Sequence, residues 1–543
     1  MSQINVSHLS FRYDTSFDPI FEDVSFTLDT DWRLGLIGRN GRGKTTLLQL
    51  LLGRYPYQGA ITASVDFEYF PFDVEEPSHE TLAVMKSCIA PYREWELQME
   101  RLLDDGSEAA LSEYGTVLEQ YLSADGYTID SRIEEELGRL GMPGELLHRP
   151  FDTLSHGERT RVLLAALFLR PGCFLLIDEP TNHLDGPGRD AVADYLAGKK
   201  GFILVSHDRE LLDRATDHIM AINRSDIEVQ QGNYSVWQEN KDRRDAFELA
   251  ENERLKKDIA RLGAAAKQRA GWSDALESTK IGHRPPDQVP PDRGFIGHKS
   301  AKLMKRAKVI ERRAQQAVEE KSALLKNLET ADELKISPLD WRNRRLLEVS
   351  GLSIDYGSGP LFEPLSFAVE PGERVALCGS NGCGKSSILH LLLGEDIPHE
   401  GGVLLSSGLE ISFLPQDTSS LRGGLREFAQ RREIDESLFK AILRKLDFSR
   451  VQFEKDIAEF SGGQKKKVLL AASLCERAHL YVWDEPLNFV DILSRVQIEE
   501  LILRSGPAML FVEHDRRFTD RIATKIVQLK RLPVDTISPR FVV

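Results

Sequence analysis

The chain is poor in cysteine and has no long hydrophobic run. Its five cysteines are spread over 543 residues without a Cys-x-x-Cys pair, which argues against zinc, iron–sulfur and disulfide frameworks. Apolar segments such as 173–177 and 387–393 are far shorter than the roughly 20 residues of a membrane-spanning helix. The first residues enter a strand-like pattern without a basic and then apolar leader, so we expect a cytoplasmic protein without a membrane domain.

Positive charge is scarce overall but concentrated in one segment. The chain has a net charge of −15, yet residues 241–330 contain 21 Lys and Arg against 14 Asp and Glu, which leaves −22 for the remainder. Phosphate contacts come from Lys and Arg, and acidic surfaces repel phosphates. An acidic body with one basic segment therefore suits a protein that touches a polyanion with that segment only.

Two phosphate-binding loops divide the chain into similar halves. Residues 38–45 and 379–386 both read Gly-x-x-x-x-Gly-Lys-Thr/Ser, and each follows an apolar strand and opens an apolar helix. Backbone N–H groups of such a loop and the helix dipole hold phosphates, the Lys binds the β- and γ-phosphates, and the Thr or Ser ligates Mg²⁺. The predicted nucleotide-binding residues are Gly38, Asn40, Gly41, Arg42, Gly43, Lys44, Thr45 and Thr46 in the first half, and Gly379, Asn381, Gly382, Cys383, Gly384, Lys385, Ser386 and Ser387 in the second.

Each half also has a buried-type strand that ends in two adjacent carboxylates, and a later strand followed by one histidine. The two carboxylates point to opposite sides of the strand, so one can join a Mg²⁺ shell while the next polarises the attacking water. The predicted metal ligands are Asp178 and Asp484, the predicted water-activating groups are Glu179 and Glu485, and the predicted γ-phosphate partners are His207 and His514.

The elements Leu154-Ser-His-Gly-Glu158 and Phe460-Ser-Gly-Gly-Gln464 open apolar helices at the same distance before the carboxylates. With them, the order of motifs resembles that of ATP-binding cassette (ABC) ATPases. In that family, the signature of one half closes over ATP held by the other half. The resemblance implies that Ser461 and Gly463 cap the first phosphate loop, that Ser155 and Gly157 cap the second, and that Tyr13 and Tyr356 stack on adenine.

One departure from the family pattern predicts unequal sites. Gln416 matches the glutamine that senses Mg²⁺ and water in ABC ATPases, so the resemblance adds it to the metal ligands. The first half has Phe72 at this position, in Tyr69-Phe-Pro-Phe72, and a phenyl ring cannot coordinate a metal. A milder departure is His156, which replaces the usual first glycine of the signature.

The first half is longer than the second between phosphate loop and signature. Gly38 and Ser155 are 117 residues apart, whereas Gly379 and Ser461 are 82 apart. The surplus lies around 85–130, where apolar residues recur at helical spacing on both sides of an Asp-Asp-Gly break. This pattern predicts a protruding helical pair, and the alternative is a longer helical subdomain.

The joining segment, residues 237–341, reads as two helices with a tip between them. Leu303, Ala307, Ile310, Ala314 and Ala317 recur at coiled-coil spacing, and Leu255, Ile259 and Leu262 do so before them. The tip, 279–298, is rich in Pro and Gly, which no helix continues through. About 35 helical residues at 1.5 Å each would carry that tip roughly 50 Å.

The predicted fold is therefore α/β, with two P-loop ABC ATPase domains in tandem, 1–236 and 342–543, joined by an antiparallel α-helical hairpin. Two fused cassettes with a long basic linker resemble the ABC-F class of ribosome-binding proteins. Segments 36–48, 244–253, 304–308 and 480–488 are similar to its Lsa-type antibiotic-resistance branch.

The resemblance implies ATP and Mg²⁺ as cofactors, and a monomer whose two cassettes pair within the chain. It implies the ribosome as partner, with contacts to large-subunit rRNA and tRNA near the exit-tRNA site and neither membrane nor DNA. The linker tip would then displace lincosamide, streptogramin A or pleuromutilin drugs. The alternatives are a housekeeping ABC-F factor, a tandem transporter ATPase, and a DNA-repair type ABC ATPase, which typically has zinc cysteines or longer coils.

Overall fold

The structure, a computed structural model, describes most of the two halves and little of the segment between them. The described residues are 2–13, 19–182, 184–223, 226–248, 250, 251, 254, 309, 312, 336, 338–357, 359–448 and 450–531. They fall into two compact units, one formed by residues 1–234 with 331–543 and one by residues 235–330. Residues 234–248 are helical, but most of the predicted hairpin and all of its tip, 279–298, lie outside the described residues.

The first half contains a six-stranded sheet, parallel except for its last pair of strands. In spatial order the strands are β5 (Asp66–Phe70), β6 (Cys173–Asp178), β7 (Phe202–Val205), β3 (Arg33–Gly38), β8 (His218–Ile222) and β9 (Ile227–Gln231). β6 and β7 are almost wholly apolar and buried. Such continuous apolar runs are typical of parallel strands covered on both faces, which is why they carry so little alternation.

A three-stranded antiparallel sheet packs beside it, against the helix that follows the first phosphate loop. Its order is β2 (Phe21–Asp29), β1 (Gln3–Phe11), β4 (Gln58–Thr62). Ile4 and Leu9 of β1 share one buried core with Leu34 of β3 and with Leu47 and Leu48 of α1 (Lys44–Leu51). Because both sheets pack around α1, the preceding phosphate loop is fixed where it enters this helix.

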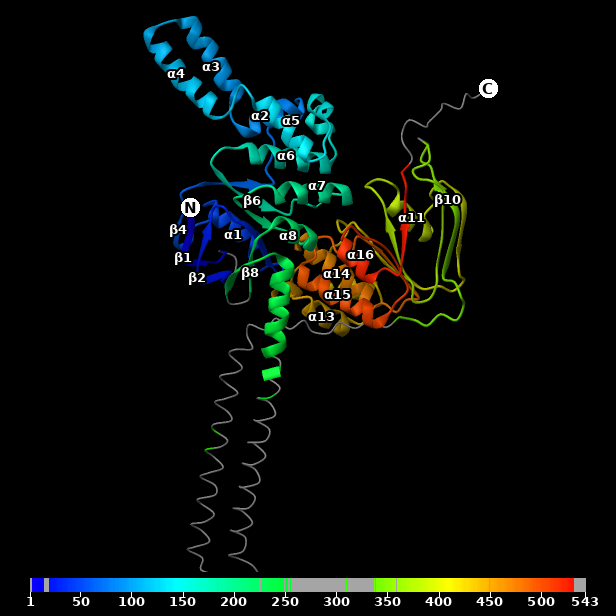
Figure 1. Cartoon of the computed structure of the whole chain (residues 1–543). Coiled ribbons are helices and arrows are strands. Elements are labelled where there is room, and N and C mark those ends of the chain that lie inside the picture. Colours follow the sequence, from blue (N-terminus) through cyan, green and yellow to red (C-terminus); the bar gives the residue numbers. More distant parts are fainter. Residues whose placement is uncertain are drawn as a thin grey trace, which may run out of the picture. The chain divides into compact units, whose positions relative to one another are not determined.

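A helical hairpin occupies the interval of the predicted insertion, 85–130. α3 (Tyr92–Asp105) and α4 (Glu108–Ser123) meet at Gly106, which ends α3 in the left-handed conformation. Figure 1 shows the pair standing apart from the sheets of this half. At its base, the rings of Tyr92 and Tyr121 pack edge to face. The other helices of this half are α2 (Thr81–Ile89), α5 (Ile129–Arg139), α6 (His156–Leu169), α7 (Gly186–Ala197) and α8 (Arg209–Ala215).

The second half repeats this plan with fewer strands and a shorter helical part. Its five-stranded sheet is parallel throughout, in the order β14 (Ile411–Leu414), β15 (Leu480–Asp484), β16 (Met509–Val512), β12 (Arg374–Cys378), β17 (Lys525–Gln528). Its antiparallel sheet is β11 (Leu365–Val369), β10 (Leu347–Ile354), β13 (His399–Leu405). Its helices are α11 (Lys385–Leu392), α12 (Leu425–Arg431), α13 (Glu436–Lys445), α14 (Gly462–Cys475), α15 (Ile492–Ser505) and α16 (Arg516–Ile522).

The shared strand order brings the predicted site residues to one edge of each parallel sheet. β3 and β12 end at the phosphate loops, β6 and β15 at the carboxylate pairs, and β7 and β16 two residues before the histidines. Ligands of open α/β sheets bind at these carboxyl ends. Across the part of the chain that is described, no helix is long and apolar enough to cross a membrane.

Candidate functional site

Both phosphate loops fold as their glycines predict. Gly43 and Gly384 precede α1 and α11 in the left-handed conformation, with φ of 89° and 97°. A side chain at Gly43 would also meet Ile20 at 2.5 Å. Behind these glycines, Lys44 Nζ donates to the Gly38 carbonyl at 2.8 Å, and Lys385 Nζ donates to the Gly379 carbonyl at 2.9 Å. Each lysine is therefore held over the loop that it is predicted to serve.

At the first site, the carboxylate pair lies against the phosphate loop. Asp178 Oδ2 accepts hydrogen bonds from Thr45 Oγ1 at 2.8 Å and from the Tyr69 hydroxyl at 3.1 Å. Glu179 has a φ of 52°, a backbone conformation that is uncommon outside glycine, and its Oε1 lies 3.4 Å from His207 Nε2. The structure thus groups four predicted residues and adds Tyr69, which the motifs did not single out.

The first loop and the second signature line the same cavity, of about 460 Å³. Its walls are Tyr13, Ile20, Asn40, Gly41, Gly43, Lys44, Thr45, Thr46, Asp178, Glu179, Val205 and His207 from the first half, and Ser461, Gly462, Gly463, Gln464 and Phe489 from the second. Asn40 Nδ2 donates to the Phe489 carbonyl at 2.7 Å. A Cβ at Gly463 of the second half would lie 2.8 Å from Asn40 Nδ2 of the first, so the two halves approach closely here.

Further contacts tie predicted loop residues to their surroundings. Arg42 reaches across to Asp447 of the second half, with its Nη2 at 3.3 Å from Oδ2. The Tyr13 hydroxyl lies 2.9 Å from Thr46 Oγ1. The equivalent pair in the second half, Tyr356 and Ser387, is 3.1 Å apart, and the ring of Tyr356 is largely exposed. The two predicted adenine partners therefore start from the same local geometry.

At the second site, the carboxylate that follows β15 has more polar neighbours. Glu485 Oε2 accepts from Gln416 Nε2 at 2.7 Å and also from Asn488. Its Oε1 lies 3.4 Å from His514 Nε2. Asn381, Gly382 and Cys383 lie in the loop between β12 and α11. The contact predicted between this loop and Ser155 with Gly157 stays a prediction.

The electrostatics of the two glutamates differ in direction. Burial raises the pKa of Glu179, and the neighbouring carboxylate of Asp178 raises it further. Burial also acts to raise the pKa of Glu485, but the hydrogen bond and charge of His514, together with Gln416 and Lys385, outweigh it and lower the pKa to about 2. Burial, with the charges of Lys44 and Arg495, lowers the pKa of His207 well below its ordinary value.

The two signatures have one local structure. Ser155 and Ser461 are the N-caps of α6 and α14, and each forms a capping box, with Glu158 and with Gln464 respectively. Their side chains accept hydrogen bonds from the helix, so the first turns present their N–H groups in a fixed direction. A helix N-terminus of this kind is an anion site, which agrees with the predicted role in holding phosphate.

The oxygen donors beside each loop fit magnesium. Asp484 Oδ1 is buried and has no hydrogen-bond partner among the described residues. Mg²⁺ favours hard oxygen ligands and usually takes one or two from protein, with water and substrate phosphates completing its shell. Thr45 with Asp178, and Ser386 with Asp484, supply such pairs. The described part of the chain has no cluster of three or more His, Cys, Asp or Glu residues that would hold a metal by protein ligands alone.

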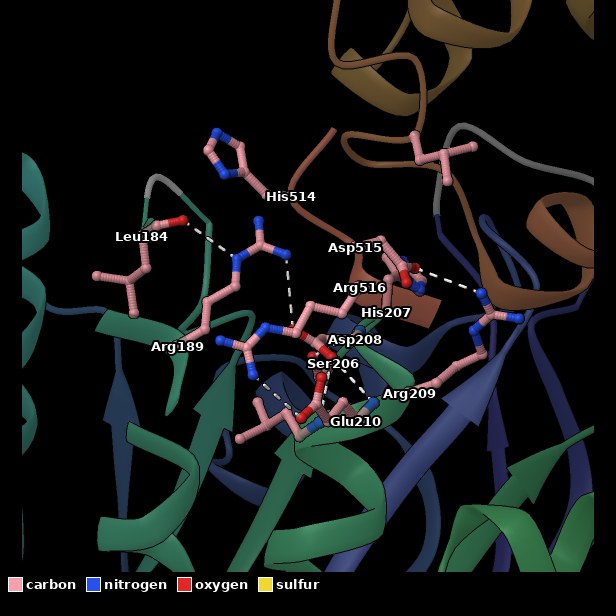
Figure 2. Close-up of polar contacts among 12 residues, drawn as sticks. Leu184, Arg189, Ser206, His207, Asp208, Arg209, Glu210, His514, Asp515 and Arg516 are labelled. Atoms are coloured by element: carbon pink, nitrogen blue, oxygen red, sulfur yellow. Dashed lines mark hydrogen bonds and ion pairs between the residues drawn. The ribbon is translucent and has the colours of Figure 1, made fainter. Parts of the chain in front are cut away.

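Two clusters of ion pairs join the halves, one beside the histidine of each site. A buried cluster next to His207 links Arg209 of the first half to Glu499 and Asp515 of the second. An exposed cluster next to His514 links Arg516 of the second half to Asp190 and Glu210 of the first. Figure 2 shows Arg209 directed at Asp515 and Arg516 directed at Glu210, in each case a carboxylate of the opposite half. The motifs gave no indication of these contacts.

Phe72 makes a contact that no glutamine could make. The Arg170 guanidinium lies over its ring, 5.0 Å from the centroid, and Arg170 also pairs with Glu68 of β5. The ring is thereby part of a packed cation–π contact. Phe72 is therefore a packed residue beside β5, and the first site lacks the glutamine that the second site has.

The sequence and the fold were compared with known proteins. A family model described as ABC transporter matches residues 21–182 and 362–488, more than half of the chain. The probable ATP-binding protein YbiT of Escherichia coli O157:H7 is 28% identical over 94% of this chain and 93% of its own length. The ribosome protection protein VmlR of Bacillus subtilis strain 168 is 27% identical, over 95% of this chain and 85% of its own. The energy-dependent translational throttle protein EttA of Escherichia coli K12 is also 27% identical, over 94% and 89%.

A solved structure has the same arrangement of two halves. The archaeal ribosome recycling factor aABCE1, in complex with the stalk protein aP1, superposes with a TM-score of 0.57 at 17% identity. The match covers 97% of this chain and 88% of that one. At this identity the likeness shows the fold, and together with the family model it confirms the predicted tandem of two α/β nucleotide-binding domains.

Proposed function

Because the chain belongs to the ABC transporter family and carries two of its ATPase cassettes, we propose that it is an ABC-F protein whose ATP-driven closure controls binding to the ribosome. The cassettes make it an ATPase. The observation that carries the proposal is the cavity shared by Lys44 and Asp178 of one half and Ser461 and Gly463 of the other. An ATP held there touches both halves, so binding favours the closed form by its differential affinity.

In the proposed reaction, the chain's own residues position ATP and one water molecule. Lys385 binds the β- and γ-phosphates, and Glu485 orients the attacking water while Gln416 holds the carboxylate. His514 hydrogen-bonds the γ-phosphate. Ser386 with Asp484, and Thr45 with Asp178 at the other site, would each hold a Mg²⁺, which when bound would supply positive charge to the phosphate oxygens. Loss of the γ-phosphate removes contacts that both halves share, which allows the halves to separate.

The basic linker and the comparisons support the ribosome as the partner. Residues 241–330 carry a surplus of positive charge, whereas the rest of the chain is acidic. Two proteins that match over most of this chain are named for translation and ribosome protection. We therefore place the closed chain near the exit-tRNA site of a cytoplasmic ribosome, with the linker against large-subunit rRNA and tRNA.

The first experiment traps the closed form. A chain in which Glu179→Gln and Glu485→Gln are combined binds ATP without hydrolysing it, so we expect it to sediment with ribosomes in ATP and not in ADP. The matched control adds Lys44→Ala and Lys385→Ala, which removes nucleotide binding. Failure of the trapped chain to bind ribosomes in ATP, at low or moderate salt, would contradict the proposal.

The finer proposal is that the linker tip displaces drugs of the lincosamide, streptogramin A or pleuromutilin type. The test is the minimum inhibitory concentration of each drug in a susceptible host that expresses the chain, with and without deletion of residues 285–296. We expect tolerance with the full chain and its loss on deletion. If ribosome binding persists but neither form changes tolerance, the housekeeping alternative holds, which the name of the throttle protein among the relatives favours.

A further inference from the structure

β5 with the loop after it, and β14 with the loop after it, are equivalent segments of the two halves, but their polar side chains stand at different positions. β5 pairs with β6 so that Phe70 faces Ile177, the residue before Asp178. β14 pairs with β15 so that Leu414 faces Trp483, the residue before Asp484. The register therefore makes Tyr69 the equivalent of Phe413, and Phe72 the equivalent of Gln416.

At these two positions, aromatic and polar groups are exchanged. The second half has a phenyl ring on the strand and a glutamine in the loop, and that glutamine donates to Glu485 at 2.7 Å. The first half has a phenol on the strand and a phenyl ring in the loop. The Tyr69 hydroxyl donates to Asp178 Oδ2 at 3.1 Å. Each site thus receives one polar contact from this segment, from a different residue and to a different carboxylate.

The hydroxyl of Tyr69 lies where the phosphate loop meets the carboxylates. The oxygen that accepts its hydrogen bond, Asp178 Oδ2, also accepts from Thr45 Oγ1 at 2.8 Å. The Arg54 guanidinium lies 5.7 Å from the centroid of the tyrosine ring. The phenol is the donor of the hydrogen bond to Asp178, because an ionised carboxylate only accepts.

We propose that Tyr69 is a positioning residue of the first ATP site, and that its hydroxyl supplies this site with a polar contact from a segment in which Phe72 provides none. By donating to Oδ2, the phenol restricts the rotation of the Asp178 side chain and leaves its other oxygen for the metal. The inference rests on the proposed role of Asp178 as a Mg²⁺ ligand. It extends that role because it assigns the support of the ligand to a residue outside every family motif.

The test isolates the first site and measures binding as well as turnover. All variants carry Lys385→Ala, so that nucleotide binds at the first site alone. The affinity for a fluorescent ATP analogue is measured with Mg²⁺ and with EDTA. We expect Tyr69→Phe to weaken the Mg²⁺-dependent affinity about tenfold, as for loss of a hydrogen bond to a charged group, and to leave the EDTA value unchanged.

A rescue separates positioning from packing. In the double variant Tyr69→Phe with Phe72→Gln, the first site regains the glutamine that the family resemblance makes a Mg²⁺ ligand, and we expect most of the Mg²⁺-dependent affinity to return through that ligand. Phe413→Tyr, the matched change in the second half, leaves the first site unaffected. The thermal midpoint of Tyr69→Phe without nucleotide is measured alongside, and a merely structural tyrosine would lower it and show no rescue.

The outcomes distinguish the inference from the proposal beneath it. If Asp178→Asn abolishes the Mg²⁺ dependence but Tyr69→Phe does not change it, Tyr69 has no positioning role and the inference is overturned. If Asp178→Asn itself has no effect on the Mg²⁺ dependence, the proposed metal site is wrong. A Tyr69→Phe effect that persists equally in EDTA would also overturn the inference.

Discussion

The buried and exposed clusters join the same two halves but differ in their access to water. The side chain of Arg209 is 6% exposed and that of its partner Glu499 is wholly buried, whereas Arg516, the equivalent arginine of the second half, is 54% exposed. Removing one partner of a buried pair leaves an uncompensated charge in the interior, while an exposed pair is screened by solvent. Loss of one partner should therefore cost more in the buried cluster, which lies beside the first ATP site.

The two ATP sites also differ in the polar contacts of their catalytic groups, and here the second site has more of them. The second site has the full set of polar contacts, since Gln416 and His514 both meet Glu485. The first site has Phe72 in place of the glutamine. The buried cluster thus lies beside the site with the less complete set of polar contacts, and we expect the first site to retain ATP while the second site hydrolyses it.

The largest expected effect concerns turnover. Glu485→Gln removes the proposed water-activating group from the complete site, and we expect kcat to fall by at least about 100-fold. Glu179→Gln should leave more than half of the wild-type kcat, because the first site lacks the glutamine. Steady-state phosphate release at saturating Mg-ATP measures both variants. Equal losses of kcat in the two variants would show that the two sites contribute equally to turnover.

The next effect concerns the ion pairs. Arg209→Ala leaves Glu499 buried with only Arg521, 2.9 Å away, so we expect the free energy of unfolding to fall by about 3 kcal/mol. The matched change Arg516→Ala should cost about 0–1 kcal/mol. Urea unfolding followed by tryptophan fluorescence compares them. Similar losses for the two variants would show that burial does not distinguish the clusters.

A third effect depends on pH. Lys467 Nζ lies 2.6 Å from Asp491 Oδ2 in the interior of the second half. Burial acts to raise the pKa of Asp491, but the charge and hydrogen bond of Lys467 outweigh it and hold that pKa well below its ordinary value. Since the folded-state pKa is lowered, this stabilisation is fully present above the unfolded-state pKa near 3.9 and is lost as the pH falls below it.

Lys467→Met should therefore cost about 3 kcal/mol of unfolding free energy at pH 7 and less at pH 3, where the Asp491 carboxylate of the variant, buried without its lysine, takes up a proton. Urea titrations at both pH values measure the difference. The first half has Arg161 at the equivalent position, bonded to the carbonyls of Gly157 and Leu140 and not to a carboxylate. Arg161→Met consequently serves as the control. If the cost of Lys467→Met grew as the pH fell, the pairing of Lys467 with an ionised Asp491 would be contradicted.

The smallest effect concerns the signature serines. Ser155→Ala and Ser461→Ala each remove an N-cap, at a cost of about 1 kcal/mol of unfolding free energy. Ser107→Ala removes the cap of α4, far from any predicted ATP contact in the sequence. All three should lower stability alike, but only the signature variants should weaken ATP binding. Loss of ATP affinity in Ser107→Ala would refute a special role of the signatures.

Residues whose roles follow from local chain geometry could be predicted from the sequence. The glycines before Lys44 and Lys385, the strands that end at Asp178 and Asp484, and the helices that begin after Ser155 and Ser461 depend on neighbouring residues only. The structure places them where the motifs require. The tandem α/β fold followed from two such sets.

Contacts between distant segments could not be predicted in this way. Arg209 and Glu499 are 290 residues apart, and Asn40 and Phe489 are 449 apart. No motif marks Tyr69, because its role depends on the register of β5 against β6. The sequence does carry one usable signal. The polar residue of this segment is Tyr69 in the first half, where the second half has Phe413, and it is Gln416 in the second half, where the first half has Phe72.

The central claim, that ATP is held between the halves, is tested most directly by counting retained nucleotides. The chain with Glu179→Gln and Glu485→Gln should retain two ATP molecules after rapid gel filtration. Adding Gly463→Ala places a Cβ 2.8 Å from Asn40 Nδ2 of the first half and 2.5 Å from the Phe489 carbonyl oxygen that accepts from Asn40, which disrupts the contact between the halves over the first loop. We predict that retention then falls to one ATP per chain. Retention of two would contradict the account.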